Sequence, residues 1–281
     1  MAGALFLLLL TLLLGVITNT TTIASKASGQ IEATRIARES FDLIGRDIST
    51  ASLPWARTNT NSLQFLVNSS NYFNSMFWQA PIVRDATNTM GNLAIVGYFV
   101  LRDLQANGQN SRFQLRRVLI DPRSTNGDYT VYNTNTPWIT DSTISTFGPA
   151  TAALDNQNAQ KGWLADGVLA MWVRCFDKTN GIITNAAGNG FDSRKGLQVT
   201  AKQWYPTNYS VLPAFVEVAL VCVAPREIVK IKRLPANTVI NPASATFYGD
   251  VSTYASNVRA TNAGVKSVTF FTRKYRLYNS D

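Results

Sequence analysis

The first fifty residues of the chain join an apolar run to a charged amphipathic segment, with no proline between them. Residues 1–17 read MAGALFLLLLTLLLGVI, and the first lysine or arginine is Lys26. The first proline is Pro54, so no residue in this stretch forces a helix to break. At ~1.5 Å per residue such a helix is roughly 75 Å long, which exceeds the diameter of an ordinary head domain. The sequence therefore predicts a helical rod that projects from the rest of the chain.

The charged half of this segment carries its less polar residues at helical spacing. Between residues 23 and 51 they recur at intervals of three and four, which predicts one helix face packed on a head. Arg35 and Glu39 stand four apart, as expected for an ion pair on the solvent side. The weak helix formers at 18–22 predict local unwinding there. On this pattern the residues expected to pack against the head are Ile31, Phe41, Ile44 and Ile48.

Three interpretations of the apolar run fit its composition. A cleaved signal peptide would need a basic region before the run and a small-residue cleavage site after it, and neither is seen. A plain bilayer anchor would have barely enough length to cross a ~30 Å hydrocarbon core. We favour a third interpretation, in which the run lies in a membrane before assembly and then packs against neighbouring copies in a filament. The residues expected to make this assembly contact are Leu5, Phe6, Leu7, Leu8, Leu9, Leu10, Leu12, Leu13, Leu14, Val16 and Ile17.

The remainder of the chain predicts a β-rich head with its own core. Apolar or alternating runs at 63–67, 93–101, 112–120, 163–176, 214–223 and 267–278 predict strands, and 226–233 predicts another with one wet face. Residues 235–264 predict a short helix or an irregular excursion. The turn sequences between the runs favour antiparallel pairing. The expected fold class is α+β: a long N-terminal α-helix with a hydrophobic first half (residues 1–52, hydrophobic over 1–17), then a mainly antiparallel head of six to nine strands (residues 53–281).

The two cysteines, Cys175 and Cys222, lie in separate predicted strands. Alternation places each of them on an apolar face, so both thiols are expected to be buried. If the two strands are neighbours, a cross-strand disulfide is one outcome, which an extracytoplasmic location would permit. Two buried free thiols are the other outcome, and the sequence leaves both open.

The residue types that most enzymes and metal sites need are sparse. The chain has no histidine, which removes the usual general base near neutral pH and the commonest zinc ligand. Neither a glycine-rich phosphate loop nor a Gly-x-Ser-x-Gly elbow occurs. Asp166 and Glu217 fall within predicted strands, where edge positions or ion pairs explain them better than a catalytic pair. We expect no enzyme activity, no cofactor and no metal site.

The net charge of +9 is carried by the head, because residues 1–52 contain as many acidic as basic residues. A basic head attracts polyanions such as nucleic acid or acidic polysaccharide. A solvated basic surface without a dedicated ligand accounts for the same composition and is the preferred interpretation. The alternative function is a membrane-tethered binding head or adhesin that recognises polyanions or polysaccharide. A secreted hydrolase with a residual anchor is a second alternative.

Several segments, taken in order, resemble J-type minor pseudopilins and related type IV pilin-like proteins. Residues 32–51 resemble the end of the long helix in that family, where an apolar face precedes an Arg-Asp or Arg-Arg pair. Residues 164–173 (LADGVLAMWV) and 212–221 (LPAFVEVALV) resemble two of its strands, and 270–277 its closing strand. The sequence is most similar to the Verru_Chthon cassette protein C family of pilin-like proteins.

This resemblance implies a helical spine, a β-rich head and insertion in the inner membrane of a cell envelope. It further implies assembly with copies of itself or other pilin-like subunits into a periplasmic or extracellular filament, either a type IV pilus or a type II secretion pseudopilus. Such proteins carry a basic leader, a cleavage-site glycine and then Phe-Thr-Leu-x-Glu, whereas the apolar run here starts at Met1. Aligned with the family, Met1 falls inside the mature helix. The glutamate that neutralises a neighbour's terminal amine has no assigned counterpart in this sequence.

Overall fold

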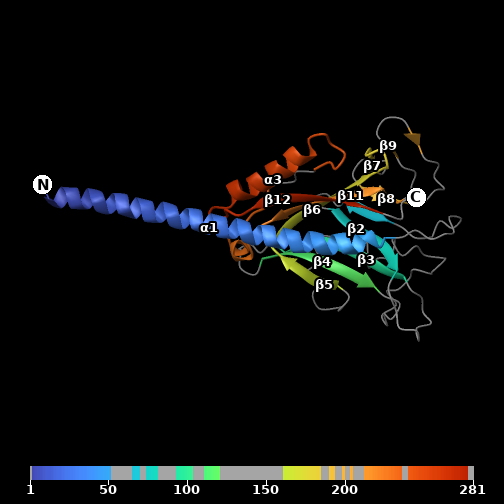
Figure 1. Cartoon of the computed structure of the whole chain (residues 1–281), viewed down its shortest axis with the longest axis horizontal. Coiled ribbons are helices and arrows are strands. Elements are labelled where there is room, and N and C mark those ends of the chain that lie inside the picture. Colours follow the sequence, from blue (N-terminus) through green and yellow to red (C-terminus); the bar gives the residue numbers. More distant parts are fainter. Residues whose placement is uncertain are drawn as a thin grey trace.

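One long helix and a two-sheet head make up the molecule, as Figure 1 shows. The computed structural model describes residues 2–51, 65–69, 74–81, 93–103, 111–120, 161–184, 190–193, 198–199, 203–204, 212–235 and 240–277. Helix α1 (Ala2–Ser49) has 48 residues, and its first half projects beyond the head. It runs unbroken through residues 18–22, so the local unwinding expected there is wrong. The boundary proposed at residue 52 falls beside residues outside the described part of the chain.

The first sheet has the strand order β5-β4-β3-β2-β1-β8. All of its pairings are antiparallel, and the predicted pairing of 93–101 with 112–120 is confirmed. Ile95 lies opposite Ile120 in that pair, and Asp103 opposite Arg112. Its strands are β1 (Leu66–Ser69), β2 (Asn74–Pro81), β3 (Leu93–Asp103), β4 (Arg112–Ile120), β5 (Lys161–Asp166) and β8 (Phe191–Asp192).

The second sheet has the order β10-β9-β7-β6-β11-β12 and is also antiparallel throughout its described pairings. Of the strands missed in the sequence, β7, β8, β9 and β10 have two or three residues each, too few to show a period, whereas β2 has eight. The head therefore exceeds the expected six to nine strands. This sheet consists of β6 (Val168–Phe176), β7 (Ile182–Thr184), β9 (Gln198–Val199), β10 (Gln203–Trp204), β11 (Phe215–Cys222) and β12 (Thr269–Arg276).

Gly167 divides the single strand expected at 163–176 into β5 and β6, which belong to different sheets. Its φ of +85° is a left-handed conformation that side chains disfavour. The Gly167 amide donates to the carbonyl of Phe113 in the first sheet at 2.8 Å. Its carbonyl accepts from the Val223 amide, just past the second sheet, also at 2.8 Å. One residue thus carries the chain from one sheet to the other.

Two apolar cores follow from this arrangement. The larger core lies between the two sheets and includes the buried face of α1, which contacts β5, β11 and β12. Because β5 and β12 are edge strands of different sheets, α1 covers the open side between them (Figure 1). The second core lies on the other face of the second sheet. It is covered by α3 (Phe247–Thr261), which confirms a helix within 235–264, and by the short 3₁₀ helix η3 (Pro225–Lys230).

The strand expected at 226–233 is wrong, because η3 occupies most of it. Pro225 begins this helix, where its fixed φ and missing amide are tolerated. Ile228 and Ile231 are buried at a spacing of three residues, which matches a 3₁₀ turn. In an alternating strand, two residues three apart would point to opposite faces. Arg226 and Lys230 are exposed on the surface of this helix.

Of the two outcomes left open for Cys175 and Cys222, the cross-strand disulfide does not occur, although β6 and β11 are neighbours. Both thiols are free and buried, as the other alternative stated. The register sets Cys175 opposite Val216 and Cys222 opposite Val168. At ~3.3 Å per residue the cysteines are therefore about 20 Å apart along the strands, whereas a disulfide requires Cα atoms within about 7 Å. Alternation predicted which face each thiol takes but not the register.

Candidate functional site

The projecting half of α1 is the part of the molecule whose surface is hardest to reconcile with water. Residues 2–25 contain no Asp, Glu, Lys or Arg and span ~36 Å at 1.5 Å per residue. By length and composition α1 is able to cross a membrane. The side chain of Leu5 lies outside the described part of the structure. The other residues expected to make the assembly contact are all exposed, from 65% for Val16 to 43% for Leu10: Phe6, Leu7, Leu8, Leu9, Leu10, Leu12, Leu13, Leu14, Val16 and Ile17.

Three threonines near the end of the projecting half bond their hydroxyls within the helix. The hydroxyl of Thr18 donates to the carbonyl of Leu14 at 2.9 Å, and that of Thr20 to Val16 at 2.8 Å. Thr21 donates in the same way to Ile17 at 2.6 Å. A hydroxyl bonded within its own helix costs little to remove from water, whereas an unpaired one costs several kcal/mol. The segment compatible with an apolar environment therefore extends past Ile17.

The second half of α1 buries one face against the head, but this face is not entirely the expected one. Phe41, Ile44 and Ile48 are buried as predicted, whereas Ile31 is 71% exposed, so its placement against the head is wrong. At 100° per residue, Ile31 stands roughly 200° around the helix from Ala33 and thus on the opposite side. Small residues on the true face were not among the predicted head contacts. These are Gly29, Ala33, Ala37 and Ser40, and their spacing of four, four and three residues was the available signal.

Glycines let the helix approach the head closely. A Cβ added at Gly45 would lie 2.6 Å from Cε1 of Tyr275 on β12, and one at Gly29 would lie 2.8 Å from Cβ of Ser267. The hydroxyl of Tyr275 donates to the carbonyl of Phe41 at 2.7 Å. Burial raises the pKa of Tyr275, so this hydroxyl keeps its proton and remains a donor. The backbone of α1 is therefore in direct contact with Tyr275 of β12 and with Ser267, in addition to the apolar packing.

A charged anchor holds the last turn of α1. Asp47 accepts hydrogen bonds at 2.6 Å from Nε of Arg117 on β4 and at 2.5 Å from the hydroxyl of Tyr98 on β3. The Asp47 side chain is 11% exposed, so water screens this contact weakly. Burial raises the pKa of Tyr98, and the Asp47 carboxylate raises it further. Arg273 pairs with Asp42 one turn earlier, but that contact lies on the surface.

Near its exit from the head, α1 meets η3 and the segment before β12. Nη2 of Arg226 donates to the carbonyl of Ser25 at 3.1 Å. The neighbouring Glu227 is buried and accepts from Ser267 Oγ at 2.7 Å and from the amides of Ser267 and Lys266 at 2.9 Å. Burial alone would raise the pKa of Glu227, but these donors outweigh it and the pKa falls below its ordinary value. Ser267, held in this way, is the residue against which Gly29 packs.

Replacement of Glu227 is expected to remove a pH-dependent stabilisation. The folded-state pKa is lowered, so the charged form stabilises the fold above the unfolded pKa of about 4.3, and this contribution is lost as the pH falls through the folded pKa. We expect Glu227→Gln to lower the free energy of unfolding by about 2 kcal/mol at neutral pH. The difference from the wild type should shrink on acidification, as measured by urea unfolding in detergent at a series of pH values. A difference that stays constant with pH would contradict this role for the charge.

The carboxylates that the sequence placed within strands are engaged in structural contacts. Glu217 on β11 pairs with Arg174 on β6 at 3.2 Å and accepts from the Tyr248 hydroxyl at 2.6 Å. Asp166 on β5 accepts from the side-chain amide of Gln114 at 2.8 Å. The two belong to different sheets, so the structure does not assemble them into a pair. Within the described ranges, no group of three His, Cys, Asp or Glu residues is placed to hold a metal ion.

Among known proteins, the chain is similar to solved structures. No family model matches the sequence, and no curated protein matches it. The chain is similar to a type IV-like pilin from Thermus thermophilus, with 10% identity and a TM-score of 0.36 over 88% of this chain and 95% of that one. It is also similar to a structure from Vibrio vulnificus, a binary complex of two pseudopilins of the type 2 secretion system. That match has 13% identity and a TM-score of 0.29 over 68% of this chain and 84% of the other. The structure itself confirms the expected fold class, a long N-terminal helix with a hydrophobic first half followed by antiparallel sheets.

Proposed function

We propose that the chain is a structural subunit of a filament, which it joins through the projecting half of α1. The observation that supports this most strongly is the ~36 Å helical surface without charge and with all its described large apolar side chains exposed. Monomeric soluble proteins rarely leave so large an apolar surface in water. Before assembly this surface would lie in the inner membrane, and afterwards among the equivalent helices of other subunits. These are copies of the same chain or other pilin-like subunits, in a type IV pilus or a type II secretion pseudopilus.

The energetics favour both environments over water and differ little between them. Burying one Leu or Phe side chain contributes about 1.5–3 kcal/mol relative to water, so the exposed set supplies tens of kcal/mol in total. Lipid is already apolar, so transfer from the bilayer to a bundle of helices gains only packing and interhelical contacts. Movement from the membrane into a filament therefore needs an energy-consuming assembly machine, while the mature filament is held without covalent bonds.

The packing of the second half of α1 against the head explains how a filament with a core of helices can carry its heads on the outside. The second half of α1 is fixed along both sheets by its buried face and by the Asp47 anchor. A head fixed in this way follows the helix as one body. Helices that pack side by side at the centre of the filament would then set the spacing of the heads around it.

The proposal is tested by electron microscopy of the full-length protein as detergent is removed. We expect fibres from the wild type, and single particles from the double variant Leu9→Glu/Leu13→Glu, because two carboxylates cannot be buried among apolar helices. The matched control Gln30→Glu/Thr34→Glu adds the same charge at the same spacing, at exposed sites on the second half of α1, and should leave fibre formation intact. If the wild type remains a single soluble particle without detergent, the proposal is wrong.

A further inference from the structure

Basic side chains gather where α1 leaves the head. One follows the charge-free part of the helix directly, and the others lie on η3, on the segment after it and on the segment before β12. Glu227 is the acidic residue within 225–235, and it is buried with its carboxylate held by Ser267 and Lys266. We name these exposed residues the exit collar: Lys26, Arg226, Lys230, Lys232, Arg233 and Lys266.

Hydrogen bonds show that the parts of the exit collar adjoin one another. Arg226 reaches the carbonyl of Ser25, the residue before Lys26. The ammonium of Lys230 donates to the carbonyl of Gly264 at 3.2 Å. The amides of Lys232 and Arg233 donate to the Asn262 side chain at 2.8 and 3.0 Å. In Figure 1 the orange ribbon of this region lies at the end of the head from which α1 projects.

The position of the collar indicates its partner. When residues 2–25 lie in a bilayer, their ~36 Å length exceeds the ~30 Å hydrocarbon core, so Lys26 stands among the lipid headgroups. The rest of the collar then faces the same plane. Val229 on η3 is 57% exposed beside it, an apolar side chain suited to the interface. We propose that the exit collar binds anionic phospholipid headgroups of the membrane that holds α1, and so seats the head on that surface before assembly.

Anionic lipid fits the collar better than a free polyanion does. Lysines and arginines next to a membrane-inserted segment are attracted by the negative surface of the bilayer, and the attraction decays within a Debye length. The collar lies beside the helix exit, where the bilayer would exclude an extended nucleic acid or polysaccharide. This inference rests on the part of the proposed function that inserts α1 in a bilayer, and the test reports that insertion separately.

The test uses the full chain reconstituted into phosphatidylcholine vesicles with or without 30% phosphatidylglycerol. A Val229→Cys substitution carries a fluorophore, because burial raises the pKa of the native thiols Cys175 and Cys222 and keeps them from labelling. A quencher attached to the lipid headgroups reports whether the collar lies on the surface. We expect stronger quenching in the anionic vesicles, lost in 0.5 M salt. Lys232→Gln/Arg233→Gln should lower the ratio of seated to free heads roughly 25-fold, at about fivefold per charge.

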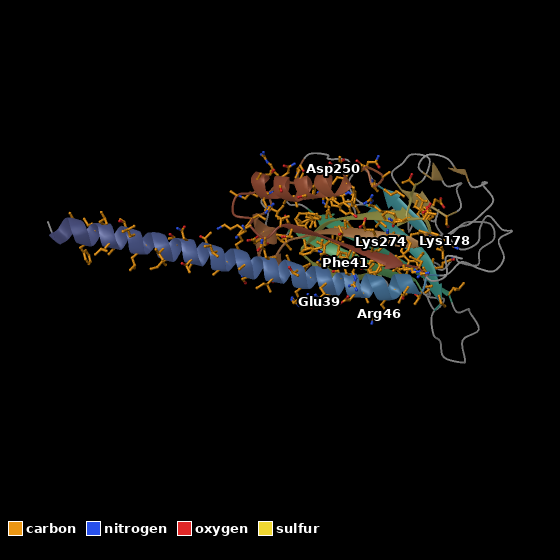
Figure 2. The ribbon with its side chains drawn as sticks, turned by 45° about the horizontal axis from the view of Figure 1, so that its top comes forward. Glu39, Phe41, Arg46, Lys178, Asp250 and Lys274 are labelled. Carbon is orange, nitrogen blue, oxygen red and sulfur yellow. The ribbon has the colours of Figure 1, made fainter. Side chains whose placement is uncertain are left out.

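The matched control is Lys178→Gln/Arg46→Gln, which removes the same charge toward the other end of the head (Figure 2). It should leave the quenching unchanged. Equal quenching in neutral and anionic vesicles, or equal loss in the control variant, overturns the inference. So does a Lys232→Gln/Arg233→Gln variant that loses retention on heparin or DNA but keeps its quenching, which would mark a polyanion site instead. If the protein fails to float with the vesicles, the proposed membrane insertion is wrong as well as the collar inference. If the protein floats but shows no quenching, only the collar inference is wrong.

Discussion

Gly167→Ala is expected to be among the most destabilising single substitutions in the head, at about 4 kcal/mol. A Cβ at this position would lie 2.3 Å from the carbonyl oxygen of Val223, a backbone atom that cannot rotate away. The left-handed φ of +85° adds a cost of about 1 kcal/mol for any residue with a side chain. Relief would require the crossing between the two sheets to open, and Ile36 of α1 packs at the same point. Urea unfolding of the full-length protein in detergent measures the loss.

Gly264 offers a control that separates the two costs. Its φ of +88° is nearly the same, but the nearest atom to an added Cβ is the flexible Lys230 side chain at 3.6 Å. Gly264→Ala should therefore cost only the conformational part, about 1 kcal/mol. Equal destabilisation by the two substitutions would show that backbone conformation, and not the approach of Val223, makes Gly167 necessary.

Asp47→Asn is expected to loosen α1 from the head, lowering the free energy of unfolding by about 3 kcal/mol. The amide keeps the shape of the carboxylate but leaves the Arg117 guanidinium without its counter-charge and removes the strong acceptor for Tyr98. Breaking a buried ion pair on one side costs more than the pair contributes, because a charge stays unpaired away from water. Arg117 is 29% exposed, which places the effect at the lower end of the usual range. The same unfolding measurement detects it.

Asp42→Asn provides the comparison on the same helix. Asp42 pairs with Arg273 across the surface, where the two side chains are 60% and 47% exposed. Exposed ion pairs contribute between 0 and about 1 kcal/mol, so this substitution should change the stability little. If the two asparagine variants lose the same stability, the burial of the Asp47 anchor is not what fixes the helix.

Residue patterns predicted the elements of this molecule better than their contacts. The uninterrupted helix follows from the absence of proline before Pro54, and the long strands at 93–103 and 215–222 from their apolar runs. Ile31 was misplaced because spacings of three and four residues fit more than one face of a helix. The small residues that mark the true face, such as Ala33, contribute little to a hydrophobic pattern.

Register and close approach leave weaker traces in a single sequence. Alternation predicted that Cys175 and Cys222 are buried, but the number of residues by which β6 and β11 are offset depends on turns and on the irregularity near Cys222. The division at Gly167 depends on a conformation that a glycine permits without demanding it. The Asp47 anchor joins residues 51 and 70 positions apart in the sequence, and no local pattern links them.

The place of α1 between the edge strands β5 and β12 has a mechanical consequence. Tension applied along the rod acts parallel to its seat, so the contacts of Phe41, Ile44 and Ile48 and the Asp47 anchor bear the load together. Contacts loaded in shear must all break at the same time, whereas contacts peeled from one end break one after another. A force that pulls on the helix is thus shared by both sheets, and the head resists detachment from α1.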